Sequence, residues 1–239
     1  MANSLYLRTT TGSKRQMTTS ASSQPAYHQI RTLVEDYFDR LGDNPRGMGW
    51  PNEPDAIRRY NVMLDVVRSA DRLQLSRPIR LLDLGCGTGH LLEHIQSSGR
   101  AQEFEYTGID LSDRFIRIAR EKYPDADFRL LDVLEEGVAL EQFDYAVING
   151  VFTSKCHMSF DEMWHFVQRI VTKVYQHTNF GVAVNMMSKQ VDWERDDLFH
   201  LPLDTLAFFL CQKLSRHFVI RNDYGLYEFT AYIYHAQVR

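Results

Sequence analysis

The sequence LLDLGCGTG at residues 81–89 decides the fold. Apolar residues run up to Asp83, and Gly85, Gly87 and Gly89 then follow within five positions. A strand, a glycine turn and a helix starting near Gly89 would present backbone N–H groups to a ligand. Because glycine has no side chain, it allows that ligand to approach the backbone closely. The stretch therefore predicts a loop that binds a nucleotide-type cofactor.

The spacing of the glycines distinguishes this loop from two other nucleotide-binding loops. The dinucleotide fingerprint is G-x-G-x-x-G, but His90 stands where its third glycine would fall. A P-loop is excluded more firmly, because no Gly-Lys-Ser/Thr follows the glycines. A nicotinamide cofactor is a less favoured alternative.

Short β-type runs alternate with helical stretches along the chain, which is typical of a mostly parallel sheet covered by helices on both faces. We expect strands at IRLLDL, EYTGID, DFRLLD, FDYAVING and FGVAVNMM, and helices near 89–98, 112–123, 135–141, 160–176 and 202–214. Ser159 and Glu162 predict a capping box before the fourth of these helices.

Two closing strands, HFVIRND and LYEFTAYIYH, are joined by too few residues for a parallel crossover. The predicted fold class is therefore α/β, a doubly wound, mostly parallel seven-stranded sheet with an antiparallel last strand. Amphipathic segments at 25–41 and after Pro54 add an N-terminal helical cap. Glu228, on the last strand, is expected to be solvated.

The length of 239 residues, 44% of them hydrophobic, suits one well-buried domain. We expect this domain at 25–239, with N-terminal helices at 25–75 and an α/β core at 78–239. Residues 1–24 are rich in Ser and Thr and cannot form a core. We interpret them as a disordered tail or as vector-encoded residues, with an organelle transit peptide as the less favoured alternative.

The formal net charge of −4 argues against a nucleic-acid partner, and no apolar run approaches the roughly 20 residues that cross a bilayer. Cys86, Cys156 and Cys211 are widely spaced and form no metal-ligand pattern. They indicate reduced thiols, a cytoplasmic location and no metal site. The pattern makes no prediction of the oligomeric state.

The glycine loop resembles the first motif of class I S-adenosylmethionine-dependent methyltransferases, in which an acidic residue and one apolar residue precede G-x-G-x-G. Two further acidic residues of that family recur in order, Asp110 after the second strand and Asp132 after the third. The resemblance covers about residues 78–235. It implies a Rossmann-like core, S-adenosylmethionine as cofactor and S-adenosylhomocysteine as product.

The resemblance also implies roles for residues around the cofactor. Asp110 would accept hydrogen bonds from the ribose hydroxyls, and Asp132 would hold the adenine amino group together with the Val133 amide. Leu111 and Val133 would sandwich the adenine. The remaining residues expected at the loop and at the methionine end are Asp83, Gly85, Cys86, Gly87, Gly89, Asn149 and Gly150.

The segments GMGW, RRYNVMLDVV, NGVF and DYGLYEFTAYIY are similar to a group of small bacterial methyltransferases. In that group the N-terminal helices lie over the cofactor, which would bring Trp50, Arg59 and Tyr60 near its sulfonium or carboxylate. Aromatic faces stabilise a sulfonium cation, and Phe152 is a further candidate for this contact.

The implied reaction is an in-line methyl transfer to oxygen or nitrogen. A small-molecule acceptor is favoured, because Asn149-Gly150-Val151-Phe152 replaces the Asn/Asp-Pro-Pro-Tyr/Phe turn of enzymes that methylate planar nitrogens. His157 is the best-placed candidate for a general base, and the alternative is a loop histidine that caps or is solvated. His200 lies between the fifth strand and the next helix, where members of the family often build acceptor pockets, and the favoured interpretation is a surface histidine.

Two other functions remain open at the level of the sequence. One is a non-catalytic module that binds S-adenosylmethionine or acts as a scaffold, since a fold and a cofactor loop do not establish turnover. The other is an NAD(P)-dependent oxidoreductase, which the glycine spacing and Asp132 disfavour.

Overall fold

The computed structural model describes residues 24–235 and contains one central sheet. Its strands are β1 Ile79–Leu84, β2 Phe104–Asp110, β3 Asp127–Leu130, β4 Phe143–Ile148, β5 Thr178–Ser188, β6 His200–Leu201, β7 His217–Arg221 and β8 Glu228–Tyr234. The expectation for residues 1–24 lies outside the described residues, Gln24 excepted.

The strand order is β3-β2-β1-β4-β5-β8-β7, and the two-residue strand β6 pairs with β5 beside this path. The pairs β1–β2, β1–β4, β2–β3 and β4–β5 are parallel. β8 runs antiparallel to both β5 and β7. The predicted fold class is confirmed, and β6 is the strand that the sequence pattern did not predict.

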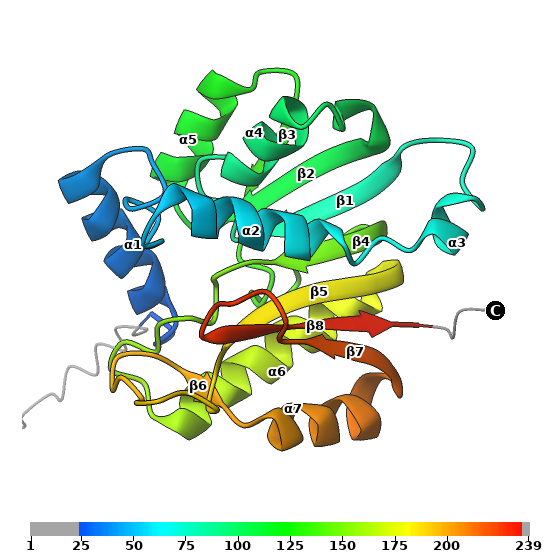
Figure 1. Cartoon of the computed structure of the whole chain (residues 1–239). Helices are drawn as coiled ribbons and strands as arrows, with labels where there is room; N and C mark the ends of the chain where they lie inside the picture. Colours follow the sequence, from blue (N-terminus) through cyan, green and yellow to red (C-terminus); the bar gives the residue numbers. More distant parts are fainter. Residues whose placement is uncertain (1–23, 236–239) are drawn as a thin grey trace, which may run out of the picture.

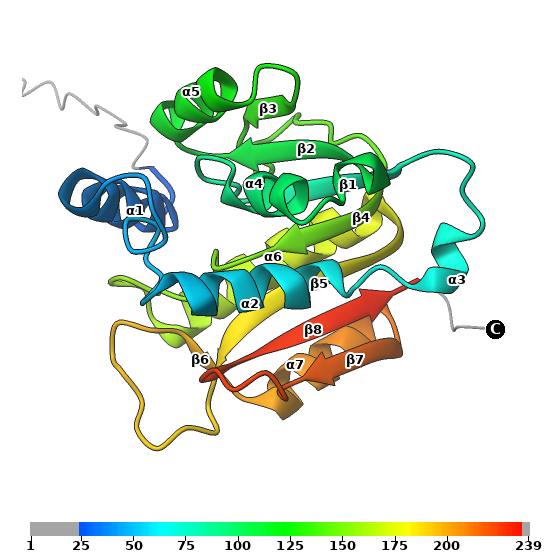
Figure 2. The same ribbon diagram turned by 45° about the horizontal axis from the view of Figure 1, so that its top comes forward.

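Helices cover both faces of the sheet (Figures 1 and 2). They are α1 His28–Leu41, α2 Glu53–Leu64, α3 Ser69–Arg72, α4 His90–Ser97, η1 Ala101–Glu103, α5 Asp113–Lys122, α6 Phe160–Gln176, α7 Leu203–Phe209 and the π-helical turn η2 Leu210–Leu214. Among the described residues, no helix has the length and apolar character needed to span a membrane.

Local sequence signals explain where α2 and α6 begin. The predicted capping box is present at α6, where Ser159 and Glu162 exchange hydrogen bonds. Pro54 lies in the first turn of α2, where its missing N–H has no helical partner to lose. The helix predicted near 135–141 is wrong, because this segment forms turns in which Gly137 has a φ of 81°.

Two apolar clusters fill the space between the sheet and its helices. Leu82 and Leu84 of β1 face the cluster that contains the buried side of α6, whereas Ile79 and Leu81 face the cluster under α2 and α4. Figure 2 shows α2 and α4 in front of the sheet and α6 behind it. This alternation along β1 is expected for a parallel strand that is buried on both faces.

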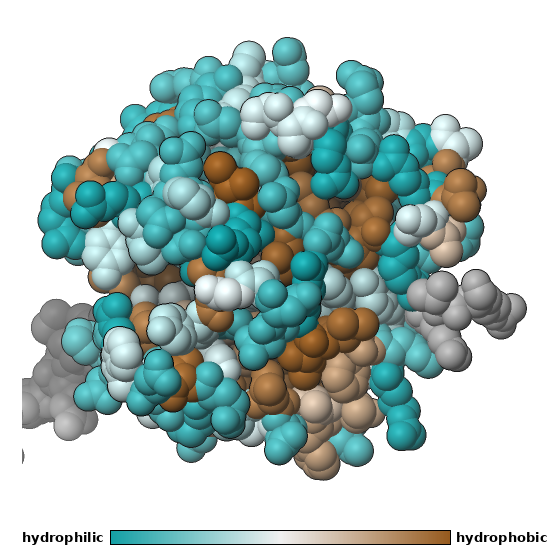
Figure 3. All heavy atoms as spheres, viewed as in Figure 1, coloured by the Kyte–Doolittle hydropathy of each residue, from teal (hydrophilic) through white to brown (hydrophobic). Residues whose placement is uncertain are grey.

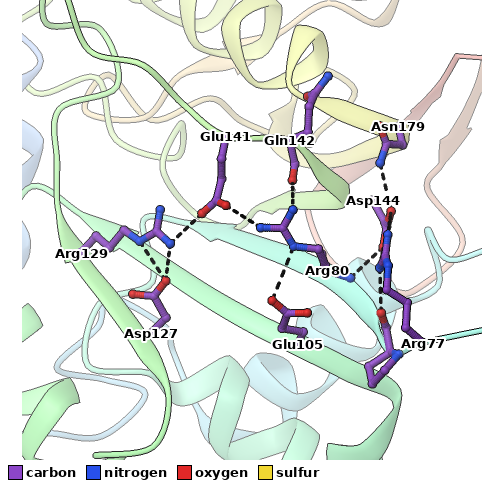
Figure 4. A network of polar contacts seen from close by, with 10 residues as sticks. Arg77, Arg80, Glu105, Asp127, Arg129, Glu141, Gln142, Asp144 and Asn179 are labelled. Atoms are coloured by element: carbon purple, nitrogen blue, oxygen red, sulfur yellow. Dashed lines mark hydrogen bonds and ion pairs between the residues drawn. The ribbon is translucent and has the colours of Figure 1, made fainter.

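The two ends of the sheet differ in their chemistry. The carboxyl ends of the parallel strands point toward α1 (Figure 2). The opposite edge carries a network of ion pairs (Figure 4), in which Arg80 contacts Glu141 at 2.5 Å and Arg77 contacts Asp144 at 2.5 Å. Asp144 is fully buried and also accepts hydrogen bonds from the Arg80 N–H and from Asn179. These polar groups therefore pair with one another at the amino ends of the strands.

Candidate active site

A pocket lies at the carboxyl edge, where β1, β2 and β4 end beneath α1. This is the place where open α/β sheets bind their ligands. The residues predicted from the sequence that line it are Trp50, Tyr60, Asp83, Gly85, Cys86, Gly87, Asp110, Leu111, Asp132, Val133, Asn149 and Gly150. The structure thus gathers most of the predicted set, from segments far apart in the chain.

The glycine loop has a backbone that side chains would not tolerate. Gly85, Gly87 and Gly89 all have positive φ angles, of 81°, 56° and 90°. Gly89 does not line the pocket; a Cβ atom there would lie 2.9 Å from the Tyr123 ring. Gly89 therefore serves the packing of the loop, and Gly85 and Gly87 face the ligand space.

Asp110 ties the glycine loop to the end of β2. Its Oδ2 accepts the Gly87 N–H at 2.9 Å, and its Oδ1 accepts the Ser112 N–H at 2.8 Å. Burial raises the pKa of Asp110, and these two N–H groups oppose the effect. The carboxylate is held rigidly at the pocket wall, and each oxygen keeps a lone pair for a ligand.

Asp132 joins the pocket to the first helix. Its Oδ2 accepts the Tyr27 hydroxyl at 2.7 Å and lies 3.3 Å from His28 Nε2, while its Oδ1 accepts the Leu134 N–H at 2.9 Å. Tyr27 stacks on Phe166 of α6 with ring centroids 4.6 Å apart. Both rings line the pocket, and the sequence analysis did not single out either residue for this site.

Asp83 lies at the floor of the pocket, next to the first glycine. Its Oδ2 accepts the Tyr106 hydroxyl at 2.7 Å. Burial raises the pKa of Asp83 to about 7, partly opposed by this hydrogen bond. The carboxyl group of Asp83 therefore ionises near neutral pH, and a nearby cationic group of a ligand would lower this pKa.

The turn after β4 carries an unsatisfied polar atom. Asn149 Oδ1 is buried without a hydrogen-bond partner among the described residues, and Asn149 lines the pocket. Gly150 donates its N–H to Asn185 Oδ1 at 2.7 Å, which fixes the turn. A buried acceptor without a partner is costly, so this position favours a ligand that carries an N–H or O–H donor.

Trp50 separates the pocket from two neighbouring cavities, because its side chain lines all three. One of them, of about 320 Å³, contains Arg59 and Glu228. We call it the Trp50 cavity; its lining is Gly49, Trp50, Pro51, Asp55, Arg59, Thr153, Met187, Val191, Asp192, Trp193, Arg195, Leu198, His200, Leu226, Tyr227 and Glu228.

Arg59 lines the Trp50 cavity rather than the cofactor pocket, and it reaches that pocket only through its contact with Trp50. Its Nε lies 3.0 Å from both carboxylate oxygens of Glu228, and its guanidinium stacks over the Trp50 ring at 4.4 Å. Glu228 is only 2% exposed, so the expectation that it is solvated is wrong. The partner 169 positions away supplies the charge that makes this burial tolerable.

The three remaining predicted residues lie outside the cofactor pocket. His157 is exposed and lines none of the described cavities. His200 is buried rather than on the surface; its Nδ1 donates to the Ser188 carbonyl at 2.7 Å and its Nε2 accepts the Arg195 N–H at 3.1 Å. Phe152 is fully buried against Phe166. Phe152 thus has a packing role, His200 is a hydrogen-bonded residue that lines the Trp50 cavity, and the position of His157 fits a loop residue.

The connector between α1 and α2 is fastened to the glycine loop, which sequence reasoning missed. Asp43 accepts the Thr88 hydroxyl at 2.6 Å and lies 2.9 Å from His90 Nε2. Lys122 of α5 contacts the same carboxylate at 3.0 Å. His90, which breaks the dinucleotide fingerprint, therefore helps to anchor the connector between α1 and α2. This connector brings Met48 and Trp50 to the pocket.

A family model described as a methyltransferase domain matches residues 81–174. The chain is 30% identical over 172 residues to a Mycobacterium tuberculosis protein named as a methyltransferase, Rv1506c, covering 69% of this chain and 95% of that one. It is 34% identical over 127 residues to the Escherichia coli O-antigen chain terminator bifunctional methyltransferase/kinase WbdD, of which it covers 17%.

Solved structures with the same fold contain bound cofactor. The magnesium protoporphyrin IX methyltransferase of Synechocystis, with bound S-adenosylhomocysteine, has a TM-score of 0.59 at 12% identity and covers 88% of this chain and 100% of its own. The 1,6-didemethyltoxoflavin-N1-methyltransferase of Burkholderia thailandensis, with S-adenosylhomocysteine, has a TM-score of 0.54 at 16% identity and covers 89% and 90%. At these identities the likeness concerns the fold.

Proposed function

This chain belongs to the class I S-adenosylmethionine-dependent methyltransferases, and on that premise we propose that it methylates an oxygen or nitrogen atom of a small molecule in the cytoplasm. The observation that carries the proposal is the junction at Trp50, where the pocket of the glycine loop meets a second cavity. A transferase needs two such adjoining spaces, one for the donor and one for the acceptor.

The donor is assigned to the pocket at the carboxyl edge. In this proposal Asp110 accepts the ribose hydroxyls, and Asp132 with the Val133 amide receives the adenine between Leu111 and Val133. Asn149 Oδ1, which is buried and unpaired, would accept a hydrogen bond from the amino group at the methionine end. Tyr60 and Trp50 supply aromatic faces for the sulfonium.

The residues of this chain contribute mainly positioning to the reaction. A lone pair of the acceptor attacks the methyl carbon, the carbon–sulfur bond breaks, and its electrons remain on sulfur as neutral S-adenosylhomocysteine. A proton on the attacking atom passes to solvent or to a base. Asp110, Asp132 and the glycine loop are fixed by hydrogen bonds, and they would hold the donor so that its methyl group meets the acceptor in one orientation.

The small-molecule acceptor is supported by the size of the Trp50 cavity, about 320 Å³, and by its aromatic lining. A structural neighbour carries the small heterocycle 1,6-didemethyltoxoflavin beside S-adenosylhomocysteine. The three cysteines are free thiols, which supports a cytoplasmic location.

The proposal is tested with the purified chain in two steps. Calorimetry with S-adenosylhomocysteine and with NADH should show binding of the former alone. Incubation with methyl-labelled S-adenosylmethionine and a pooled set of phenols, amines and heterocycles should then label at least one compound. Tight binding of the cofactor without any labelled product would favour a non-catalytic module, and binding of NADH alone would overturn the assignment of the donor.

A further inference from the structure

The Trp50 cavity has aromatic rings at its mouth. Trp193 is 68% exposed and Tyr227 is 60% exposed, and their ring centroids lie 6.3 Å apart at an interplanar angle of 48°. The two residues are far apart in sequence, in the segment between β5 and β6 and in the turn before β8. Such large exposed rings at the rim of a cavity favour a flat apolar ligand, which would remove both from water.

A buried cation with an unused donor lies deeper in the same cavity. Arg59 is only 7% exposed, and its Nη1 is buried without a hydrogen-bond partner among the described residues. Its Nε is already committed to Glu228 at 3.0 Å. Since an unpaired buried donor is destabilising, the cavity is complementary to a ligand that brings an acceptor atom to Nη1.

The charge of the lining decides what kind of acceptor atom fits. Three carboxylates line the cavity, those of Asp55, Asp192 and Glu228, against the two guanidinium groups of Arg59 and Arg195. Arg59 is already neutralised by Glu228, and Arg195 pairs with Asp197 at the surface. A carboxylate ligand would place a further negative charge close to Glu228, whereas an uncharged oxygen would not.

This cavity is coupled to the methyl-donor end by a short chain of hydrogen bonds. Asn185 donates from Nδ2 to Glu228 Oε1 at 3.2 Å and accepts the Gly150 N–H on its Oδ1 at 2.7 Å. Glu228 in turn holds Arg59, whose guanidinium stacks on Trp50. These contacts therefore fix the position of a ligand bound at Arg59 relative to the turn at Gly150, which lines the donor pocket.

We propose that the Trp50 cavity binds the methyl acceptor as a planar aromatic compound that presents an uncharged carbonyl-type oxygen to Arg59 Nη1, an inference that rests on the proposed function. Trp193 and Tyr227 cover the ring, and Trp50 lines both this cavity and the donor pocket. Figure 3 shows hydrophobic residues also exposed near β7, but none of the described residues of β7 lines this cavity.

The test uses the full chain saturated with S-adenosylhomocysteine and three matched probes. These are 1-naphthamide, which is planar and neutral, 1-naphthoate, which is planar and anionic, and cyclohexanecarboxamide, which is neutral and saturated. Affinities are measured by calorimetry and by ligand-observed NMR. We expect 1-naphthamide to bind at least tenfold more tightly than either of the other probes.

Variants then locate the site. Trp193→Ala and Tyr227→Ala should each weaken 1-naphthamide binding at least fivefold. Arg59→Lys, which keeps the charge beside Glu228, should reduce the preference for 1-naphthamide over 1-naphthoate. Phe208→Ala is the matched control, because Phe208 on α7 is 70% exposed and lines none of the described cavities. The affinity of Phe208→Ala for 1-naphthamide should equal that of the wild type.

The outcomes separate this inference from the proposed function. If S-adenosylhomocysteine binds but the three probes bind alike, or if 1-naphthoate binds best, the inferred acceptor class is wrong while the cofactor assignment stands. Binding of 1-naphthamide that is unaffected by both aromatic variants also overturns the inference. Failure to bind S-adenosylhomocysteine would instead contradict the donor site.

Discussion

Trp50 packs against Gly150 so closely that a Cβ atom at position 150 would lie 2.5 Å from the indole Cη2. Gly150 also has a φ of 79°, and its N–H is committed to Asn185. The turn after β4 and the connector before α2 are thus fitted to each other at the boundary between the two cavities. Any side chain at position 150 must displace the indole or the turn.

Gly150→Ala should therefore reduce methyl transfer at least tenfold, measured as labelled product at saturating cofactor. The substitution combines a left-handed backbone with a clash against a rigid ring. Gly137→Ala is the matched control, because Gly137 has a φ of 81° but an added Cβ would meet no atom within 4 Å. It should cost about 1 kcal/mol of stability and leave turnover intact. Equal activity of the two variants would show that the Trp50 contact is unimportant.

Asp110→Ala should weaken binding of S-adenosylhomocysteine by on the order of 2–4 kcal/mol in calorimetry, because charge-assisted hydrogen bonds to the ribose are lost. The Gly87 and Ser112 N–H groups also lose their acceptor. Thermal unfolding without ligand separates these effects, and Asp110→Asn, which keeps an acceptor, should fall between wild type and Ala. An unchanged affinity would remove Asp110 from the binding site.

The sequence could predict the donor half of this site and most of the fold because these depend on local signals. Strand periodicity, the glycine spacing, Asp110 at the end of β2 and Asp132 shortly after β3 are all read from short contiguous segments. The helix expected near 135–141 failed because apolar residues there pack against the core from turns, which periodicity alone does not distinguish from a helix.

The acceptor half could not be predicted, since it is built from long-range pairs. Nothing local to Glu228 reveals that Arg59 will neutralise it, so solvation was the reasonable expectation. His200 was assigned to the surface for the same reason; its two ring partners lie in a loop and at the end of β5. Tyr27 reaches Asp132 only through the docking of α1 across the strand ends.

Asp83 should make cofactor binding depend on pH, since burial raises its pKa to about 7. The cationic groups of S-adenosylmethionine favour the ionised carboxylate, so binding should release a proton, and affinity should rise up to about tenfold between pH 6 and pH 8. The free energy of unfolding should change in the opposite direction. Because the pKa of Asp83 in the folded protein exceeds its unfolded value of about 3.9, the ligand-free protein should lose stability as pH rises from about 4 to about 7.

Calorimetry in buffers of different ionisation enthalpy measures the proton release by Asp83. Asp83→Asn should flatten the pH profile of affinity. Tyr106→Phe should shift the midpoint to higher pH, because the Tyr106 hydroxyl lowers the pKa of Asp83. A profile that is identical in wild type and Asp83→Asn would exclude this carboxylate from the site.

Asp144, near the amino ends of the parallel strands, should contribute to stability without affecting the binding of S-adenosylhomocysteine. Burial raises its pKa, but hydrogen bonds from Arg77, the Arg80 N–H and Asn179 outweigh this effect and hold the pKa below its usual value. The stabilisation is therefore present above the unfolded pKa and is lost as pH falls through the folded pKa. Asp144→Asn should lower the free energy of unfolding at pH 7 by on the order of 2–4 kcal/mol, since Arg77 loses its buried counter-ion.

Urea unfolding at pH 7 and near pH 3 measures this contribution, and the difference between Asp144→Asn and wild type should shrink at the lower pH. Asp223→Asn is the control, because Asp223 pairs with Arg221 at the surface and its side chain is 70% exposed; screened pairs of this kind contribute little. Below its unfolding transition, Asp144→Asn should bind S-adenosylhomocysteine as wild type does. Loss of binding in the folded variant would mean that the two ends of the parallel strands are coupled through β4, which contains Asp144 and leads into Asn149 and Gly150.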